Sequence, residues 1–587
     1  MEMVNVIIDG VSVQVEKGTT VLEAARKAGI NIPTLCYLKD VNAIGACRVC
    51  LVEVKGAKAL QPSCVYPVSE GLEVLTNTAK VLEARKAVIE LLLSNHPADC
   101  LTCVRSGKCE LQALAQQMGI REVRFTGEQS VFPVDDRSVA IVRDPNKCVL
   151  CHRCEAVCKK VQGVNILGTI NRGFNSTVGP AFGHNLDDIN CALCGQCVNV
   201  CPTGALSEKD DTGKVWQALA DETKHTIVQF SPAVRIAISE EFGLPMGTIS
   251  TGKMVAALRR LGFDKVFDTN WSADLTIMEE GNELLDRLQN GGVLPMITSC
   301  SPGWIKFCEH HFPDQLDHLS SAKSPQAMFG AMVKTYYPQT EGIDPASIYS
   351  VSVMPCTAKK FEAARPELCD SGYRDVDAVI TVREVARMIK QAGINFADLP
   401  DEECDAPMGV GTGAATIFGA TGGVMEAALR TVYEVVTGQT LEKVDFEAVR
   451  GMDGVKEATV DLNGTQVKVA VVHTLARARE IMEKVKAGTA DYTFIEVMAC
   501  PGGCVGGGGT PIVNSLTRSM LPDDYRAIRG MGLYNDDKNL PLRKSHENPF
   551  IINAYANFLE KPLSHKAHEL LHTHYTPRKL YNLELND

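Results

Sequence analysis

The sequence lacks the features that would place it in a membrane, outside the cell or on nucleic acid. No apolar run is long enough to span a bilayer, and the first 15 residues show neither a signal peptide nor a twin-arginine signal. The formal net charge of −12 argues against nucleic acid or an anionic membrane as the main partner. No Gly-x-Gly-x-x-Gly fingerprint follows a predicted strand, so we do not expect NAD(P) to bind this chain. These absences predict a soluble, cytoplasmic protein.

Cysteine is the residue type in excess. The chain has 587 residues and 22 cysteines, whereas its 45% hydrophobic and 22% charged residues are those of an ordinary globular protein. This length predicts roughly three to five domains. Disulfides are not expected in a reducing compartment, and fifteen of the cysteines stand before residue 202, mostly in tight Cys-x-x-Cys groups. Such spacing turns several thiolates toward one point and predicts metal clusters.

The first cysteine group follows a predicted β-hairpin with an Asp9-Gly10 turn and a predicted helix over 20–28, the order of a β-grasp ferredoxin. The group is spaced Cys-x10-Cys-x2-Cys-x13-Cys and comprises Cys36, Cys47, Cys50 and Cys64. Four thiolates suit either a 2Fe–2S cluster or a structural zinc ion. The long first gap and the β-grasp order favour the cluster, in a domain of residues 1–80.

The second group follows a predicted amphipathic helix over 81–93 and contains one histidine and three cysteines. Its members are His96, Cys100, Cys103 and Cys109. A lone histidine is usually an ordinary polar residue, but His96 precedes three cysteines that have no other fourth ligand. We therefore predict a 4Fe–4S cluster with one imidazole ligand in residues 81–125. The neutral nitrogen carries less negative charge than a thiolate and would tune the reduction potential.

Two further cysteine runs carry the strongest signal. Each is spaced Cys-x2-Cys-x2-Cys-x3-Cys, the pattern of bacterial two-cluster ferredoxins, in which the fourth cysteine of each run ligates the other cluster. One predicted 4Fe–4S cluster is held by Cys148, Cys151, Cys154 and Cys201. The other is held by Cys191, Cys194, Cys197 and Cys158. Residues 138–210 thus form a predicted ferredoxin domain, and four clusters in series predict single-electron transfer to a redox catalyst.

From about residue 215 the pattern changes to apolar strands that alternate with helices. Strands are predicted over 226–230, 265–268, 293–298, 348–354, 378–381 and 493–498, and helices over 254–261 and 273–288. The alternation predicts an α/β catalytic domain of two lobes with largely parallel sheets, residues 215–525, preceded by the α+β ferredoxin-like domains. Cysteines follow several of these strands, where active sites of open α/β sheets lie. Ordinary buried thiols are predicted at the cysteines outside any motif, Cys308, Cys369 and Cys404.

Three segments at these strand ends make a family resemblance specific. They are Thr298–Trp304 (Thr-Ser-Cys-Ser-Pro-Gly-Trp), Met354–Lys360 (Met-Pro-Cys-Thr-Ala-Lys-Lys) and Glu496–Cys504 (Glu-Val-Met-Ala-Cys-Pro-Gly-Gly-Cys). In this order they resemble the signature motifs of the iron-only (FeFe) hydrogenases. The resemblance covers essentially the whole chain, including the four accessory clusters, and residues 526–587 resemble the fused small-subunit tail of that family.

The resemblance implies that the chain holds the H-cluster, a 4Fe–4S cubane joined through a cysteine sulfur to a diiron unit with CO, cyanide and azadithiolate ligands. Cys356, Cys500 and Cys504 then correspond to cubane ligands, and Cys504 bridges to the diiron unit. An ammonium group suits a buried anionic ligand, so one lysine is expected to donate to a cyanide. The residues expected around the diiron unit are this Lys359 and the walls Met354, Met498 and Phe418.

The chain departs from the family at Cys300-Ser301, where most members have two adjacent cysteines. The resemblance makes the first position the proton-relay thiol and the second the fourth cubane ligand. Alignment on Pro302 and Trp304 then gives Cys300 the relay and Ser301 the ligand position. Because an alkoxide is a poorer iron ligand than a thiolate, two interpretations stay open. Either Ser301 ligates the cubane, or a local shift lets Cys300 ligate and leaves the relay to Ser301 or water.

The resemblance also implies a proton relay from Cys300 through Glu280, Ser320 and Glu283 to Arg287 at the surface. All of these positions match, and the two glutamates and the arginine share one face of a predicted helix. On its own such a face would be a solvated charge stripe. With the neighbouring motifs the relay is favoured, because proton transfer to a buried site needs groups that accept and release protons.

The sequence thus predicts a hydrogenase that interconverts H2, protons and electrons, and two versions compete. In one the chain works alone with a soluble ferredoxin. In the other it is the catalytic subunit of a complex whose sister subunits bind flavin and NAD(P). The Cys-Ser motif and the likeness of the first two cluster domains to an electron-input module of respiratory complex I favour the complex. Hydrogenase maturation factors are further expected partners.

Two alternatives come from a different functional class. A hydrogen sensor tends to lose relay residues and to carry signalling domains, and a cluster-assembly relative loses the diiron pocket. This chain keeps Lys359, Met354, Met498 and the relay glutamates and has no appended domain. Both alternatives are therefore disfavoured.

Overall fold

The N-terminal segment forms the expected β-grasp. The computed structural model describes residues 2–441, 443–462 and 464–581. Every second side chain of β1 (Met3–Ile8) is buried, and the turn to β2 (Val11–Glu16) uses positive φ angles of 47° at Asp9 and 82° at Gly10. The sheet order is β2-β1-β5-β3-β4, with α1 packed on its core. The remaining bounds are α1 (Val21–Lys27), β3 (Leu51–Val54), β4 (Gln61–Pro62) and β5 (Leu72–Leu75).

The segments that carry the next three cysteine groups share apolar contacts with the first. Residues of α2 (Ala79–Ser94) and α3 (Glu110–Gln117) pack in one core with Cys36, Cys47 and Cys151. Two short antiparallel pairs and two short helices complete this part of the chain. They are β6 (Ile141–Arg143) with β9 (Leu206–Glu208), β7 (Gly168–Ile170) with β8 (Thr177–Gly179), α4 (Arg153–Ala156) and α5 (Gln196–Val200).

The first sheet of the catalytic half is entirely parallel, in the order β11-β10-β13-β14. Its strands are β10 (His225–Phe230), β11 (Lys265–Asp268), β13 (Ile348–Met354) and β14 (Ala378–Thr381). One face packs on α8 (Thr251–Leu261) and α13 (Val382–Gln391), and the other packs on α9, α11, α19 and α20. The latter helices are α9 (Thr269–Asn290), α11 (Pro325–Glu341), α19 (Pro549–Ala554) and α20 (His565–Leu571). Helices on both faces explain why these strands are almost wholly buried.

The second sheet has the order β12-β17-β16-β15, and only β15 runs antiparallel to its neighbour. Its strands are β12 (Met296–Ile297), β15 (Val455–Leu462), β16 (Thr465–His473) and β17 (Phe494–Met498). Helix α15 (Gly423–Thr437) covers one face, and α10 (Pro302–His311) and α16 (Leu475–Lys486) cover the other. The two lobes with largely parallel sheets are therefore confirmed, and the catalytic motifs lie just beyond β12, β13 and β17.

Two sequence-based expectations need correction. The strand predicted over 293–298 pairs only at Met296–Ile297, because Pro295 has no N–H to donate to a ladder. Cys369, predicted to be a buried thiol, is exposed, whereas Cys308 is buried and Cys404 partly buried. Within residues 2–441, 443–462 and 464–581, no helix is both long and apolar enough to cross a membrane.

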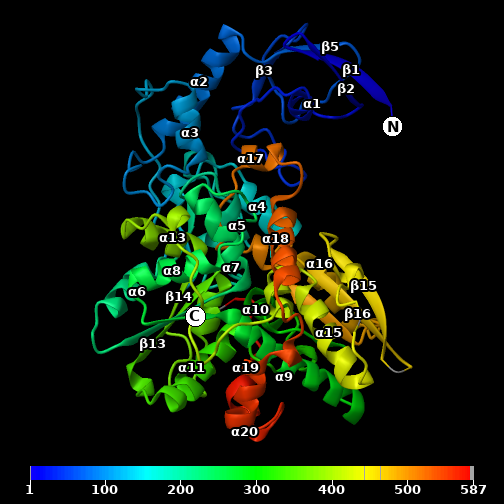
Figure 1. Ribbon diagram of the computed structural model, residues 1–587. Coiled ribbons are helices and arrows are strands. Elements are labelled where there is room, and N and C mark those ends of the chain that lie inside the picture. The colour runs from blue at the N-terminus through cyan, green and yellow to red at the C-terminus, as the bar shows by residue number, and fades with distance from the viewer. Residues whose placement is uncertain (1, 442, 463, 582–587) are drawn as a thin grey trace, which may run out of the picture.

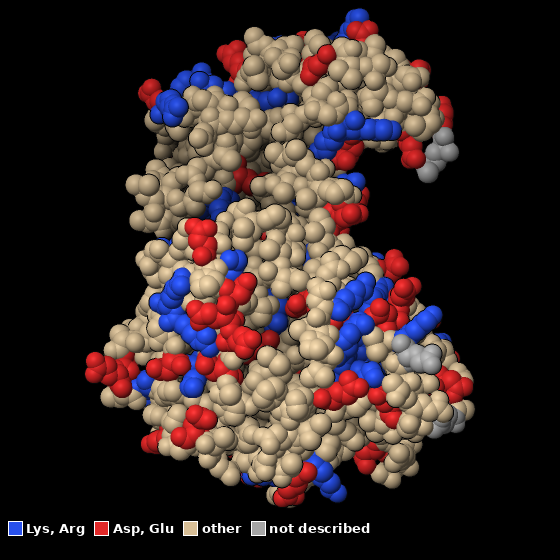
Figure 2. Space-filling view, in the orientation of Figure 1, with Lys and Arg blue, Asp and Glu red and all other residues tan. Residues whose placement is uncertain are grey.

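Segments near the C-terminal end return to the cluster domains (Figure 1). Helix α17 (Ser515–Met520) lies beside α4, and Ser515 Oγ donates to Glu110 Oε2 at 3.0 Å while accepting from Arg153 Nη2 at 3.0 Å. Helix α18 (Tyr525–Asn539) then returns toward the catalytic half. On the face shown in Figure 2, positive and negative side chains are interspersed, so this face has no continuous basic surface.

Candidate functional site

The four cysteines of the first group lie together beside the β-grasp sheet. The thiol of Cys36 contacts those of Cys47 and Cys64, and the thiol of Cys50 contacts that of Cys64. All four residues are buried, and Gly45, at a φ of 64°, turns the loop just before the second cysteine. Four buried thiols have the donor number and softness that an iron–sulfur cluster needs.

The second group lies closer to the surface. Cys100 is exposed, Cys103 and Cys109 are partly buried, and Cys103 Sγ lies against Gly204 of the ferredoxin domain. His96 Nδ1 is buried without a hydrogen-bond partner among the described residues. Burial also lowers the pKa of His96, which keeps its imidazole neutral. A neutral histidine with a free buried nitrogen fits a metal ligand.

The structure brings the two ferredoxin runs together in the crossed arrangement. One cavity is lined by Cys148, Cys151, Cys154 and Cys201. A second cavity is lined by Cys158, Cys191, Cys194 and Cys197. The fourth cysteine of each run therefore lies with the first three of the other run, as the spacing predicted.

Two buried side chains that the sequence analysis missed join neighbouring cluster loops. Asn42 Nδ2 donates to the carbonyl oxygens of Cys36, at 2.8 Å, and Cys151, at 3.0 Å. Arg105 Nη2 donates to the carbonyl oxygen of Cys201 at 3.2 Å. Both contacts end on the loops around the same ferredoxin cavity. No motif marks a lone asparagine or arginine, so the sequence offered no signal for either contact.

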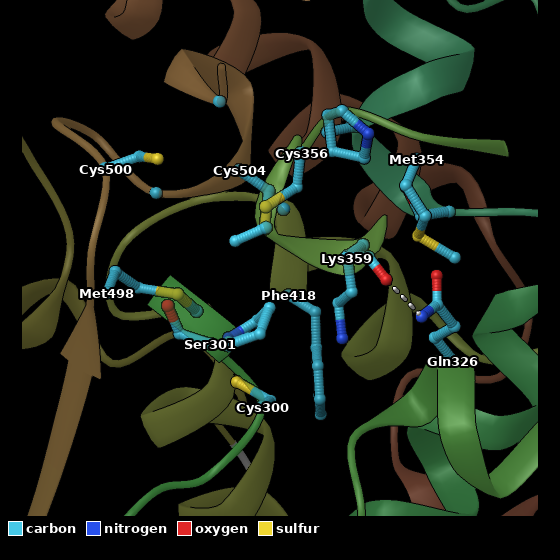
Figure 3. A pocket seen from close by; sticks show the side chains of 18 of the residues that line it. Cys300, Ser301, Gln326, Met354, Cys356, Lys359, Phe418, Met498, Cys500 and Cys504 are labelled. Carbon is cyan, nitrogen blue, oxygen red and sulfur yellow. Dashed lines mark hydrogen bonds between the residues drawn. The ribbon is translucent and has the colours of Figure 1, made fainter. Parts of the chain in front are cut away.

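The candidate catalytic site is a cavity at the carboxyl ends of three strands (Figure 3). Cys300 and Ser301 follow β12, Met354 and Cys356 lie at the end of β13, and the last segment follows β17. The sequence-predicted residues that line it are Cys300, Ser301, Met354, Cys356, Lys359, Phe418, Met498, Cys500 and Cys504. Three distant segments thus place four cysteine sulfurs, two thioethers and an ammonium around one buried space.

The cysteines of this cavity can ionise together only if a cation compensates their negative charge. Burial raises the pKa of Cys356, Cys500 and Cys504, and the mutual repulsion of thiolates raises those of Cys500 and Cys504 further. Buried thiolates at this density are stable only when a metal compensates their charge. The donor set therefore fits a multi-iron cofactor held by sulfur.

Lys359 is the main positive charge beside this cavity. It is buried, and its Nζ donates to Glu362 Oε2 at 2.8 Å and to Ser324 Oγ at 2.7 Å. Its carbonyl oxygen accepts from Gln326 Nε2 at 3.3 Å (Figure 3). The ammonium is thus fixed at the cavity wall while its charge is balanced by one carboxylate.

Cys300 and Ser301 have different surroundings although they are adjacent. Ser301 Oγ accepts from Ala499 N–H at 3.2 Å, which places it beside the segment that carries Cys500. The Cys300 thiol instead lies in the electrostatic field of Glu280 and Cys504. Burial and these negative neighbours raise the pKa of Cys300, so its thiol is protonated in this setting.

The residues predicted for the proton relay form a partly connected row that starts near Cys300. Ser320 Oγ donates to Glu283 Oε2 at 2.8 Å, and Arg287 Nη2 donates to Glu283 Oε1 at 2.7 Å. Neither carboxyl oxygen of Glu280 has a hydrogen-bond partner among the described residues. Burial, with the nearby Glu283 charge, raises the pKa of Glu280 to about 8. Glu280 is therefore neutral at pH 7, and Arg287 ends the row in a partly buried position.

A glycine run brings the ferredoxin domain close to the catalytic cavity. A Cβ on Gly508 would lie 2.4 Å from the carbonyl oxygen of Cys194, and one on Gly507 would lie 2.1 Å from that of Pro355. At these two positions glycine is required because the backbone packs directly against other backbone segments. Cys194 lines both its ferredoxin cavity and the catalytic cavity. The last accessory site and the catalytic site share a wall.

Five family descriptions match successive parts of the chain. "Iron only hydrogenase large subunit, C-terminal domain" matches residues 224–508, and "Iron hydrogenase small subunit" matches residues 523–578. "2Fe-2S iron-sulfur cluster binding domain" matches residues 1–79. "NADH-ubiquinone oxidoreductase-G iron-sulfur binding region" matches residues 85–124, and "NADH-quinone oxidoreductase subunit 3, ferredoxin-like domain" matches residues 138–207.

Relatives that match over nearly the whole chain, and a solved structure, agree with these family descriptions. The "NADP-reducing hydrogenase subunit HndD" of Solidesulfovibrio fructosivorans is 53% identical over 99% of this chain and 100% of the relative. "Iron hydrogenase 1" of Clostridium pasteurianum is 44% identical over 98% of this chain and 100% of the relative. A structure of the apo [FeFe]-hydrogenase HydA1 from Chlamydomonas reinhardtii is 45% identical, with a TM-score of 0.55, over 62% of this chain and 99% of that one.

Proposed function

The chain belongs to the iron-only hydrogenase family, and we propose that it catalyses the reversible oxidation of H2 at an H-cluster. The observation that carries the proposal is the meeting of Cys356, Cys500 and Cys504 around one buried cavity. Hydrogen-dependent reduction of a viologen dye by the matured protein tests it. If the matured protein neither takes up nor evolves hydrogen, the proposal is wrong.

The proposed cofactors are one 2Fe–2S cluster, three accessory 4Fe–4S clusters and the H-cluster. Cys356, Cys500 and Cys504 would hold the H-cluster, which supplies the iron chemistry that splits and forms H2. Met354, Met498 and Phe418 keep water from this site, and Lys359 offers N–H donors to an anionic ligand there. The shared wall at Cys194 gives electrons a short path between the ferredoxin domain and the catalytic site.

The residues beside the cavity supply the path for protons. Cys300 lies near Glu280, and both are protonated in their buried setting, so each has a proton to pass on. Ser320, Glu283 and Arg287 continue the row through hydrogen bonds of 2.8 and 2.7 Å. We assign the relay thiol to Cys300 and the fourth cubane position to Ser301, because Ser301 lies on the Cys500 side and Cys300 on the Glu280 side.

Glu280→Gln is expected to slow hydrogen evolution by about 10²- to 10⁴-fold, because an amide neither takes up nor releases a proton at this pH. The side-chain volume is kept, so cofactor content should not change. Hydrogen evolution with a strong chemical reductant, normalised to bound iron, measures the effect. Asp286→Asn on the exposed side of the same helix is the matched control. A Glu280→Gln enzyme with wild-type turnover would remove Glu280 from the relay.

We further propose that the chain is the catalytic subunit of an NAD(P)-linked complex. One full-length relative is named as a subunit of an NADP-reducing hydrogenase, and two domains match descriptions from NADH-quinone oxidoreductases. Purification of the tagged chain from its native source should yield flavin-containing subunits in fixed ratio. Recovery of the chain alone, with ferredoxin-dependent activity, would favour the stand-alone version.

Asn42→Ala is expected to slow electron transfer between the 2Fe–2S site and the neighbouring 4Fe–4S site by about 10- to 100-fold, the usual range for residues that support metal ligands. The substitution leaves the carbonyl oxygens of Cys36 and Cys151 without their shared donor. Rapid-mixing reduction, followed at the 2Fe–2S absorption band, measures the rate. Asn557→Ala on the exposed C-terminal surface is the control. An unchanged rate with both clusters present would contradict this assignment.

A further inference from the structure

The segment after α20 runs antiparallel to residues 320–323, which include the relay serine. Lys323 N–H donates to the carbonyl oxygen of Leu571, and Thr573 N–H donates to that of Ser321, both at 2.8 Å. Ala322 and His572 form an isolated antiparallel bridge between these bonds. The C-terminal segment is thus joined by backbone to the stretch that carries Ser320.

Tyr575 holds Ser320 from this segment. Its hydroxyl donates to the carbonyl oxygen of Ser320 at 2.7 Å, while Ser320 N–H donates to the carbonyl oxygen of Ile297 at 2.8 Å. Ser320 is fully buried, and its Oγ donates to Glu283. Two bonds on the backbone of Ser320 therefore fix the position from which its hydroxyl reaches Glu283.

His572 holds the other side of the relay. Its Nδ1 lies 2.8 Å from Ser321 Oγ, and its Nε2 lies 3.0 Å from Glu279 Oε2. Ser321 N–H in turn donates to both carboxyl oxygens of Glu283 at 3.1 Å. Glu279 is fully buried on α9, directly before the relay residue Glu280. One imidazole therefore links the helix that carries the glutamates to the stretch that carries the serine.

We propose that His572 and Tyr575 are positioning residues of the proton relay, which they hold at transfer distance from the C-terminal segment. The inference rests on the proposed relay function of Glu280, Ser320 and Glu283. Neither residue touches the catalytic cavity, so both act through the serine and the glutamates. Because a misplacement of about 1 Å in a reacting geometry can cost about 10²-fold in rate, modest loosening of this contact has a large effect.

Tyr575→Phe and His572→Ala test the inference in the complete chain with its clusters. Tyr575→Phe removes one hydrogen bond and keeps the ring, and we expect about 10-fold slower hydrogen evolution. His572→Ala removes the contacts with both Ser321 and Glu279, and we expect hydrogen evolution to be about 10²-fold slower. His572→Gln, which can still donate and accept, should recover part of the loss. Tyr336→Phe is the control, because the Tyr336 hydroxyl accepts from Asn553, in a C-terminal helix and outside the row of relay contacts.

Two readouts separate positioning from general loss of structure. The solvent isotope effect on hydrogen evolution should rise in both variants, because proton transfer becomes rate-limiting, and amide exchange at residues 319–323 should accelerate. Faster amide exchange with an unchanged rate and isotope effect would overturn the inference, since the segment would then stabilise the fold alone. A wild-type chain that evolves no hydrogen would instead overturn the proposed function.

Discussion

Replacing Cys504 by alanine is expected to abolish hydrogen evolution, by at least ~10³-fold, while the accessory clusters remain. Cys504 lies in the glycine-rich turn after β17 and lines the same cavity as Cys356 and Cys500. The resemblance gives Cys504 the sulfur that would join the cubane to the diiron unit, and an alanine would not supply that link. The eight cysteines of the two ferredoxin runs line two other cavities, and of these only Cys194 also lines the catalytic cavity, so their clusters should still assemble.

Hydrogen evolution, iron content and the electron paramagnetic resonance of the reduced accessory clusters together measure this result. Cys308→Ala is the matched control, because Cys308 is a buried thiol on α10 outside the cavity. Its loss should cost about 1 kcal/mol of stability and little activity. A Cys504→Ala chain that keeps a tenth or more of wild-type hydrogen evolution would show that Cys504 is not the bridge.

Replacing Cys300 by alanine is expected to lower hydrogen evolution by about 10²- to 10⁴-fold with the H-cluster fully assembled. The reason is the position of its thiol beside Glu280, whereas Ser301 lies beside Ala499 and the Cys500 segment. Loss of the thiol removes the first proton carrier but no cubane ligand.

Ser301→Cys is the matched variant for the same question. It supplies a thiolate at the proposed ligand position, so the cubane should assemble and turnover should stay near that of the wild type. Iron content and hydrogen evolution of the two variants are compared side by side. If Cys300→Ala loses the cubane, Cys300 is a ligand, and the relay thiol must be reassigned.

The cluster sites of the ferredoxin domain could be predicted from the sequence, because their ligands lie close together along the chain. Within Cys148–Cys158 and Cys191–Cys201, only two or three residues separate successive cysteines, so the chain brings their thiols together before any tertiary contact forms. The crossing of Cys158 and Cys201 also follows, because the pattern itself implies two facing runs. The structure places all eight in the expected two cavities.

The hydrogen bonds that Asn42, Arg105 and Tyr575 make could not be predicted from the sequence, because they form only when distant segments meet in the folded chain. The partners of Asn42, Arg105 and Tyr575 are 109, 96 and 255 residues away, respectively. No period or spacing relates positions so distant, and a lone asparagine or tyrosine is ordinarily a surface or core residue. The predicted extent of β12 was also wrong, since an apolar run does not show that Pro295 withholds its N–H from the ladder.

Infrared spectroscopy of the matured, complete chain decides whether Cys356, Cys500 and Cys504 hold an H-cluster in one buried cavity. We expect stretching bands of CO and cyanide in the wild-type protein, and their loss in Cys504→Ala. A protein with all four accessory clusters but no such bands would contradict the account and leave the chain as an electron carrier.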